Sequence, residues 1–171
     1  AVINADNIGR EVVENNRVLL KKLARTFGQD LLTSAGILKR KRVAQIAFAS
    51  QKNKRRLDQL VHPFLLKSLR DSIKRFARNH EVIVIDAALL LDWNLDQVAD
   101  KVLLIHSGFK KRLIRLQKRG MNISDIKARQ KWQLSYDEFR RRSDKVILNN
   151  STKSDFEKKV RNWAREYFET N

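Results

Sequence analysis

Short, continuous apolar runs rich in β-branched residues are the feature that most constrains the fold of this chain. "EVIVID" (81–86) and "DKVLLIH" (100–106) are two such runs, and uninterrupted runs of this length are typical of buried parallel strands. "KVIL" (145–148) and the opening "AVIN" (1–4) are shorter candidates for strands. The sequence therefore predicts a sheet that is built mainly from parallel strands.

Long stretches with a helical spacing of apolar residues separate these runs. The predicted helical stretches cover residues 10–26, 39–79, 108–119, 122–142 and 152–168. The second stretch should break near His62, because proline at position 63 disfavours a helical conformation of the residue before it. Ser151 or Thr152 is suited to cap the last helix. Strands that alternate with helices of this length indicate an α/β fold.

Polar residues follow the predicted strands. Asp6 comes shortly after the opening strand, Asp86 ends the "IVID" strand, and Asn149 and Asn150 follow "KVIL". Ligands of parallel α/β sheets bind beyond the carboxyl ends of the strands, so these residues predict a ligand site at that edge. The structural alternatives are helix capping by Asp6 and turn formation by the asparagines.

The formal net charge of +18 indicates anionic partners, such as nucleic acid, a membrane surface or a phosphate-rich small molecule. The basic residues recur in four separate clusters, which are "KRKR" (39–42), "KNKRR" (52–56), "KKR" (110–112) and "RRR" (140–142). Many of them are expected to solvate the outer faces of helices. Charge alone fits both a nucleic-acid-binding protein and a phosphate-handling enzyme.

Composition excludes several other classes. No apolar run approaches the ~20 residues that cross a bilayer, so no membrane partner is expected. The chain has no cysteine, which excludes disulfides and thiolate metal sites and fits a reducing compartment. No histidine–carboxylate spacing indicates zinc, and no serine has the glycine-elbow setting of a hydrolase. His80, His106 and Trp93 are expected to be structural.

Six segments occur in a characteristic order along the chain. They are "VINADNIGREVV" (2–13), "FGQDLLTSAGILKRKRVAQIAF" (27–48), "RRLDQLVHPFL" (55–65), "VIVIDAALLLDW" (82–93), "RLIRLQKRG" (112–120) and "QLSYDEFRRRSDKVILNN" (133–150). Each alone is weakly specific, but together they resemble the dephospho-CoA kinase family from Ala1 to about Thr152. These P-loop kinases use ATP to phosphorylate the ribose 3′-hydroxyl of dephospho-CoA, which completes coenzyme A.

The resemblance implies a three-layer P-loop kinase-like α/β fold with a mainly parallel sheet. It implies one kinase-like domain over 1–171, with a helical acceptor-binding region over 10–80 and a helical lid over 112–142. ATP and Mg²⁺ are the implied cofactors, dephospho-CoA is the implied partner, and the cytoplasm is the implied location. The residues present do not allow the ligands of Mg²⁺ to be assigned.

The sequence departs from the family pattern in several places. No G-x-x-x-x-G-K-[ST] motif occurs, so we expect the sequence to start at the family's second strand, without the first βα unit of roughly two dozen residues. A protein that truly lacked the P-loop would lose the amides and lysine that hold the ATP phosphates, and we would expect it to be inactive. Asn4 replaces the first aspartate of the family's Asp-Ala-Asp motif, and Ala88 replaces a proline.

The resemblance also implies roles for individual residues. Asp6 matches the catalytic aspartate, which would orient the acceptor hydroxyl and later take its proton. Arg115 and Arg119 match lid arginines that reach the ATP phosphates, and their spacing of four places them on one helical face. Arg112, three positions earlier, is expected to be a solvated surface cation.

The remaining matched positions concern the two substrates. Arg10, Arg40 and His62 match polar positions of the dephospho-CoA-binding region, and Asn149 matches a segment that passes near the adenine of ATP. The alternative function is that of a basic nucleic-acid-binding protein or a catalytically inactive relative. The high positive charge favours this alternative, whereas the scatter of the basic residues and the absence of a binding motif oppose it.

Overall fold

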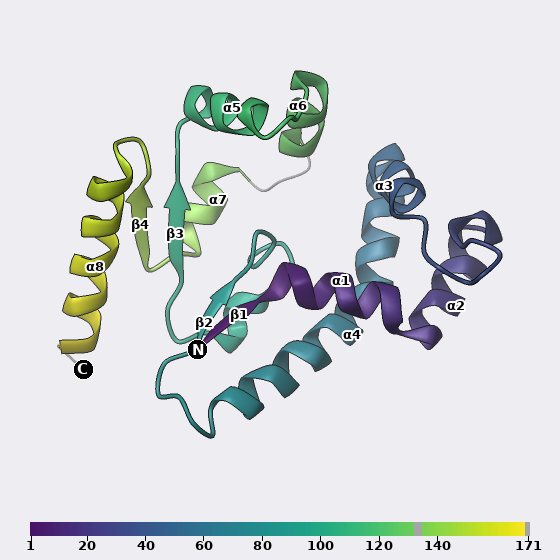
Figure 1. Ribbon diagram of the computed structural model, residues 1–171, viewed down its shortest axis with the longest axis horizontal. Helices are drawn as coiled ribbons and strands as arrows, with labels where there is room; N and C mark the ends of the chain where they lie inside the picture. Colours follow the sequence, from purple (N-terminus) through teal and green to yellow (C-terminus); the bar gives the residue numbers. More distant parts are fainter. Residues whose placement is uncertain (132–134, 170–171) are drawn as a thin grey trace. The chain divides into compact units, whose positions relative to one another are not determined.

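The computed structural model describes residues 1–131 and 135–169 and is a mixed α/β structure (Figure 1). Its chain divides into two compact units, Ala1–Trp93 and Asn94–Asn171, and each unit contains one pair of parallel strands. None of the described helices is both long and apolar enough to span a membrane.

The first unit combines two strands with four α-helices. Its elements are β1 (Val2–Asn4), α1 (Ala5–Asn15), α2 (Arg17–Phe27), the 3-10 turn η1 (Gln29–Leu31), α3 (Arg40–Ala49), α4 (Gln51–Phe76) and β2 (Val84–Asp86). β1 pairs with β2 in parallel, with Val2 opposite Val84 and Asn4 opposite Asp86. The helices α1, α2 and α3 all pack against α4, which is therefore the central support of this unit.

The predicted single helix over 10–26 is wrong, because Asn16 interrupts it. Asn16 ends α1 in an extended conformation, and its side-chain oxygen accepts a hydrogen bond from the backbone N–H of Leu19 at 3.0 Å, which starts α2. The alternative that Asp6 caps the first helix is also wrong. Asn4 is the cap residue, since its side-chain oxygen accepts from the N–H of Asn7 at 2.8 Å. Short amides suit this role because they satisfy N–H groups that the helix leaves unpaired.

The predicted helix break at the His62–Pro63 pair is wrong as well. α4 continues through Pro63, and the break lies instead at Ser50, whose hydroxyl accepts from the N–H of Asn53 at 3.1 Å. A proline inside a helix costs about 3 kcal/mol, because it removes one hydrogen bond and crowds the preceding turn. Burial offsets this cost, since one face of α4 places three apolar residues in the interior. These are Val61, Leu65 and Leu69.

The second unit has the same alternation of strands and helices. Its elements are the 3-10 turn η2 (Leu95–Val98), β3 (Leu103–His106), α5 (Phe109–Lys118), α6 (Ile123–Lys131), α7 (Tyr136–Arg141), β4 (Lys145–Leu148) and α8 (Lys153–Glu169). β3 pairs with β4 in parallel, with Leu103 opposite Lys145 and His106 opposite Leu148. Helix α8 packs against β4.

The predicted continuous helix over 122–142 is wrong, and residues 132–134 within it lie outside the described residues. A new helix, α7, follows Ser135, which forms a capping box with Glu138. The hydroxyl of Ser135 accepts from the N–H of Glu138, and the Glu138 carboxylate accepts from the N–H of Ser135. The expected cap at Thr152 is confirmed, because its hydroxyl accepts from the N–H of Asp155 at 3.2 Å.

The parallel pairing of the strands agrees with the sequence, but their expected burial on both faces does not. Ile3 and Ile147 are buried, at 3% and 4% exposure, whereas Val84 and Ile105 remain 52% and 43% exposed. Each described sheet has two strands, so every strand is an edge strand. Helices cover only part of the surface of each sheet.

Asp144 joins the two strands of the second unit. Its carboxylate accepts hydrogen bonds from the backbone N–H of Val102 at 2.8 Å and from the Lys101 ammonium at 3.1 Å. These two hydrogen bonds hold the pKa of Asp144 below its ordinary value of 3.8. The ionised carboxylate therefore stabilises the alignment of β3 with β4.

Replacing Asp144 with asparagine should lower the free energy of unfolding at pH 7 by about 1 kcal/mol, the usual size of a solvent-accessible charged hydrogen bond. Because folding lowers this pKa, the stabilisation is fully present above pH 3.8 and is lost as the pH falls through the lowered value. Urea unfolding at pH 7 and pH 3 measures both effects. A difference between wild type and D144N that stays constant between the two pH values would contradict this assignment.

Candidate functional site

The carboxyl ends of β1 and β2 place two acidic side chains at the same edge of the first unit's sheet. The register puts Asn4 opposite Asp86, and Asp6 lies two residues beyond Asn4, in the first turn of α1. Asp6 and Asp86 are both exposed. The strand runs into the helix without a loop, so the position of Asp6 is tied directly to the sheet.

Arg10 lies four residues after Asp6 on α1 and is also exposed. Residues with this spacing share one helical face, so the structure places Arg10 on the same face as Asp6. Within the described parts of the chain, Arg10 has no ion-pair partner. It is therefore available to an anionic ligand that approaches this face.

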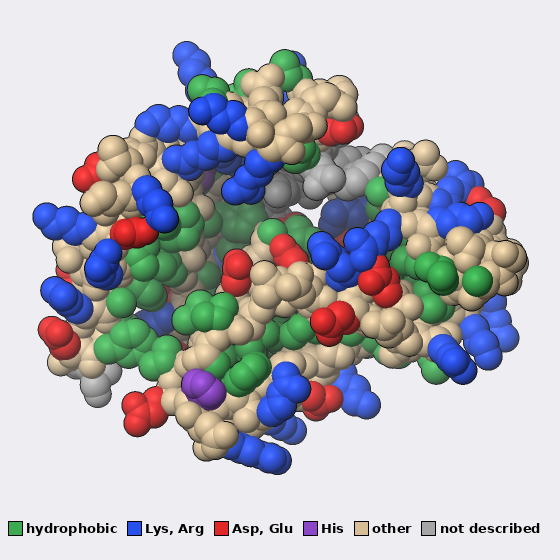
Figure 2. Space-filling view, in the orientation of Figure 1, with side chains coloured by type: hydrophobic (Ala, Val, Ile, Leu, Met, Phe, Trp, Pro, Cys, Tyr) green, Lys and Arg blue, Asp and Glu red, His purple; other side chains and the backbone are tan. Residues whose placement is uncertain are grey.

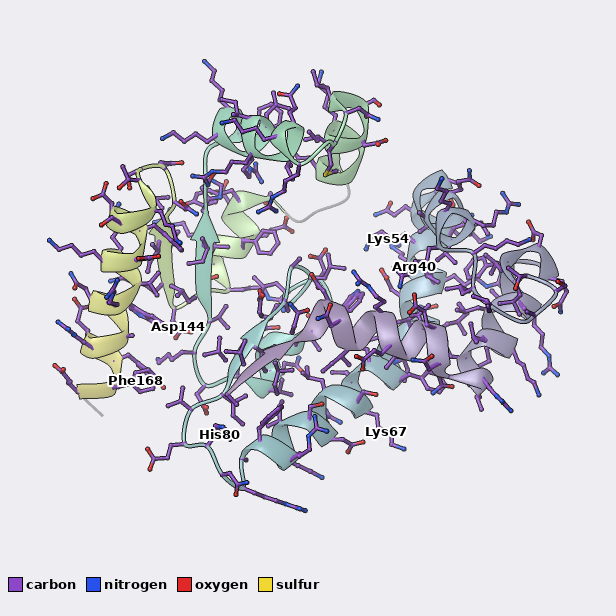
Figure 3. All side chains as sticks on the ribbon, viewed as in Figure 1. Arg40, Lys54, Lys67, His80, Asp144 and Phe168 are labelled. Carbon is purple, nitrogen blue, oxygen red and sulfur yellow. The ribbon has the colours of Figure 1, made fainter. Side chains whose placement is uncertain are left out.

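Arg40 begins α3 and forms an ion pair with Glu14 of α1. Figure 3 labels Arg40 at this end of α3. The pair links α3 to α1, so any ligand of this guanidinium would share it with Glu14. Glu14 lies one helical turn beyond Arg10, and no contact joins Arg40 directly to Asp6 in the described chain.

His62 lies on α4 near a close approach of α1. A Cβ atom on Gly9 of α1 would lie 3.7 Å from Leu65 Cδ1 and 3.9 Å from the Trp93 ring, so glycine brings the backbone of α1 near both side chains. Leu65 is three residues beyond His62. Among the described residues, His62 Nε2 and Trp93 Nε1 are buried atoms without a hydrogen-bond partner.

Two buried polar atoms without partners are expensive, at about 1–3 kcal/mol each, and such atoms in native proteins call for a water, an ion or a ligand. The structure therefore adds Trp93 to the candidate residues of the first unit. Sequence reasoning assigned this tryptophan to packing alone. No local sequence signal distinguishes a packing tryptophan from one whose indole N–H is available.

In the second unit the structure brings Arg115 and Asn149 together. Arg115 Nη2 donates to Asn149 Oδ1 at 3.2 Å, which joins α5 to the carboxyl end of β4. Asn150 accepts from the N–H of Gly108 at 2.9 Å, at the start of the same helix. Arg119 follows the end of α5 and is exposed. The side chains of the two asparagines thus connect the carboxyl end of β4 to the start of α5 and to Arg115.

Arg112 is not a fully solvated cation, contrary to the expectation from sequence. It is half-buried, and its Nε atom and the Ser107 hydroxyl are buried without partners in the described chain. The His106 ring lies 4.2 Å from the Tyr136 ring. Burial lowers the pKa of His106 from its ordinary value of 6.5, and the positive charge of Arg112 lowers this pKa further.

Three comparisons show which known proteins this chain is similar to. Residues 1–155 match the family model CoaE, dephospho-CoA kinase. The chain is 32% identical over 160 residues to a dephospho-CoA kinase of Bacillus licheniformis, covering 91% of this chain and 79% of that protein. It is 32% identical over 159 residues to a dephospho-CoA kinase of Corynebacterium glutamicum, covering 90% and 78%.

Two solved structures share the fold. The crystal structure of TT1252 from Thermus thermophilus superposes with a TM-score of 0.79 at 22% identity, over 96% of this chain and 83% of that one. Dephospho-CoA kinase from Campylobacter jejuni gives 0.68 at 21% identity, over 97% and 84%. The fold is therefore that of the P-loop kinases, as the resemblance implied.

The chain belongs to the dephospho-CoA kinase family, because the family model covers residues 1–155 and the relatives are similar over nearly the whole chain. Family membership confirms the prediction of an enzyme that is a kinase and uses ATP as a substrate.

Replacing Arg112 with glutamine should raise the pKa of His106 toward 6.5, because the nearby positive charge is removed while the burial of the ring remains. The pKa is measured by NMR from the imidazole proton shifts between pH 4 and 8. Lys118→Gln removes a charge from an exposed position of the same helix and is the control. An unchanged pKa in R112Q would show that Arg112 does not act on His106.

Proposed function

We propose that the protein transfers the γ-phosphoryl group of ATP to the 3′-hydroxyl of the dephospho-CoA ribose and so forms coenzyme A, in the cytoplasm. The observation that supports this most strongly is the match of residues 1–155 to the dephospho-CoA kinase family. We assign the catalytic role to Asp6, because it lies exposed just beyond the carboxyl end of β1. The lack of cysteine suits a reducing compartment.

In this proposal Asp6 is the catalytic residue that contacts the acceptor. Its carboxylate accepts a hydrogen bond from the ribose 3′-hydroxyl and orients the oxygen in line with the γ-phosphorus. A bond forms between the 3′-oxygen and phosphorus, and the bond to the bridging β–γ oxygen breaks. The transition state of such transfers is loose, so the proton passes to Asp6 late, and ADP leaves with the bridging oxygen.

Charge neutralisation falls to cations. Arg115 and Arg119 bind phosphate oxygens of ATP, and the planar guanidinium suits this role because it binds two oxygens at once. The hydrogen bond to Asn149 restricts the orientation of Arg115, and Asn149 itself lies near the adenine. These residues belong to a helical lid over 112–142 and the turn after β4.

When bound, Mg²⁺ would supply neutralisation of the negative charge on the ATP phosphates. Among the described residues no group of three or more histidine and acidic side chains could hold a metal. That is compatible with an ion bound by phosphates, water and one or two carboxylates. Asp86 lies at the same sheet edge as Asp6, and we assign its carboxylate as the one that would hold Mg²⁺.

The acceptor binds to a helical region over 10–80 of a single kinase-like domain. Arg10 pairs with phosphate oxygens of dephospho-CoA, and Arg40 contributes positive charge while it remains bound to Glu14. His62 Nε2 and Trp93 Nε1, which have no partner in the described chain, hydrogen-bond to polar groups of the acceptor. This would offset the cost of their burial.

Asp6→Asn should lower kcat by about 100-fold or more, because general-base and orienting groups contribute on the order of 100- to 10,000-fold. The KM for ATP should change little, since the side chain contacts the acceptor. Coenzyme A formation is measured with the complete protein, ATP, Mg²⁺ and dephospho-CoA.

Asp155→Asn, on α8, is the matched control because it removes an exposed carboxylate from a helix outside the proposed site. Equal kcat in D6N and wild type would remove Asp6 from the mechanism. Absence of coenzyme A from the folded, complete wild-type protein would contradict the proposed function as a whole.

A further inference from the structure

One stretch of the first unit carries more positive charge than the proposed reaction uses. Residues 39–56 contain eight basic residues and no acidic residue, and they form the whole of α3 and the start of α4. Figure 2 shows Lys and Arg side chains gathered over the region of α3, and Figure 3 labels Arg40 and Lys54 there.

Three of these cations serve the fold. Arg40 pairs with Glu14, Arg42 Nε lies 2.7 Å from Asp30, and Lys54 Nζ lies 2.9 Å from Asp58. The other five have exposed side chains and no ion pair among the described residues, and we call them the α3–α4 cationic surface. They are Lys39, Lys41, Lys52, Arg55 and Arg56.

Part of this surface forms a groove of about 480 Å³ along α4. The groove is lined by Gln51, Lys52, Arg55, Arg56 and Gln59. Lys52, Arg55, Arg56 and Gln59 are three or four residues apart, so they lie on one helical face over about 10 Å of helix axis. Every lining side chain offers N–H donors, and none is acidic or apolar.

This arrangement does not stabilise the isolated fold. Lys52 and Arg56 are four residues apart, and like charges at this spacing destabilise a helix by a few tenths of a kcal/mol. None of the lining residues belongs to the buried core. A ligand with several regularly spaced negative charges would offset the repulsion and use all the donors.

We propose that the α3–α4 cationic surface binds the phosphodiester backbone of a nucleic-acid duplex. A duplex carries one negative charge per about 1.7 Å of its axis, so a stripe of about 10 Å faces several phosphates at once. Arginine binds phosphate through two parallel N–H groups, and glutamine amides donate to further phosphate and sugar oxygens. Contacts of this kind give affinity without sequence specificity.

The composition of the groove distinguishes this partner from two others. Single-stranded nucleic acid is usually bound with aromatic rings on which bases stack, and no aromatic residue lines the groove. Amphipathic surfaces that bind membranes combine cations with exposed apolar side chains, and no apolar side chain lines the groove. The proposal does not rest on the proposed function: the surface lies within the helical region 10–80, but none of its five residues is among those assigned to ATP or to the acceptor.

The test measures fluorescence anisotropy of a short labelled DNA duplex of mixed sequence, titrated with the complete protein at several salt concentrations. An RNA duplex of the same sequence and phosphatidylserine vesicles are the other two probes. The variant combines Lys52→Gln, Arg55→Gln and Arg56→Gln, because glutamine keeps the helix propensity while it removes the charge. It should weaken duplex binding about tenfold or more and make the salt slope less steep by about 3.

A matched control removes the same net charge from the same helix. Lys67→Gln, Arg70→Gln and Lys74→Gln are exposed positions further along α4, beginning about 22 Å from Lys52 along the axis. Since this exceeds the Debye length of about 10 Å, the control should weaken binding less than about threefold. A second variant, Arg55→Lys with Arg56→Lys, keeps the charge and should retain binding. Thermal melts establish that each variant is folded.

Three results would overturn the proposal. The first is an equal loss of duplex affinity in the two triple variants, which would make net charge the cause. The second is binding of the wild type to vesicles but to neither duplex. The third is no binding of the wild type to a duplex at low salt. Binding to both duplexes supports backbone recognition, and a preference for one identifies the natural partner. Because coenzyme A formation is not measured in this test, its outcome is distinct from that of the proposed function.

Discussion

The parallel register of β1 with β2 is the constraint on which the proposed chemistry depends. It places Asn4 opposite Asp86 and lets the chain pass from the strand into α1 without a loop. Asn4 supplies the oxygen that caps the helix, so the carboxylate of Asp6, two residues later, is not needed for capping. The short strand β1 and the amide cap of Asn4 thus fix the place of the exposed Asp6 carboxylate at the edge of the sheet.

The second unit uses the same arrangement with different side chains. β3 and β4 are also parallel, and asparagines rather than aspartates follow the second strand. One asparagine accepts from the start of α5 and the other from Arg115. Cationic and amide groups therefore gather at this edge of the second unit, whereas carboxylates gather at the corresponding edge of the first unit.

The sequence predicts the positions of the strands and their parallel direction, because β-branched residues favour extended conformations, although β2 covers only the last three residues of the run 81–86. It fails at helix boundaries, where single polar side chains decide the outcome. Asn16 and Ser50 end helices that the apolar spacing would continue. Pro63 does not end a helix that its chemistry alone would break, because Leu65 and Leu69 bury that helix in the core. The caps at Asn16 and Ser50 are local contacts that apolar spacing alone does not reveal, whereas the continuation of α4 through Pro63 depends on tertiary contacts.

The candidate residues divide in the same way. Asp6, Arg115 and Asn149 are found from motif order and spacing, but the contact between Arg115 and Asn149 joins positions 34 residues apart and is visible only in the structure. The same holds for the unpartnered nitrogens of His62 and Trp93, because burial without a partner depends on how α1 and α4 pack at Gly9.

The measurement that tests the central claim most directly is phosphorus NMR of the complete protein with ATP, Mg²⁺ and dephospho-CoA. The account predicts a new phosphomonoester signal on the ribose 3′-oxygen that grows in step with ADP. Release of inorganic phosphate with unchanged dephospho-CoA, or a phosphate on another oxygen of the acceptor, would contradict it.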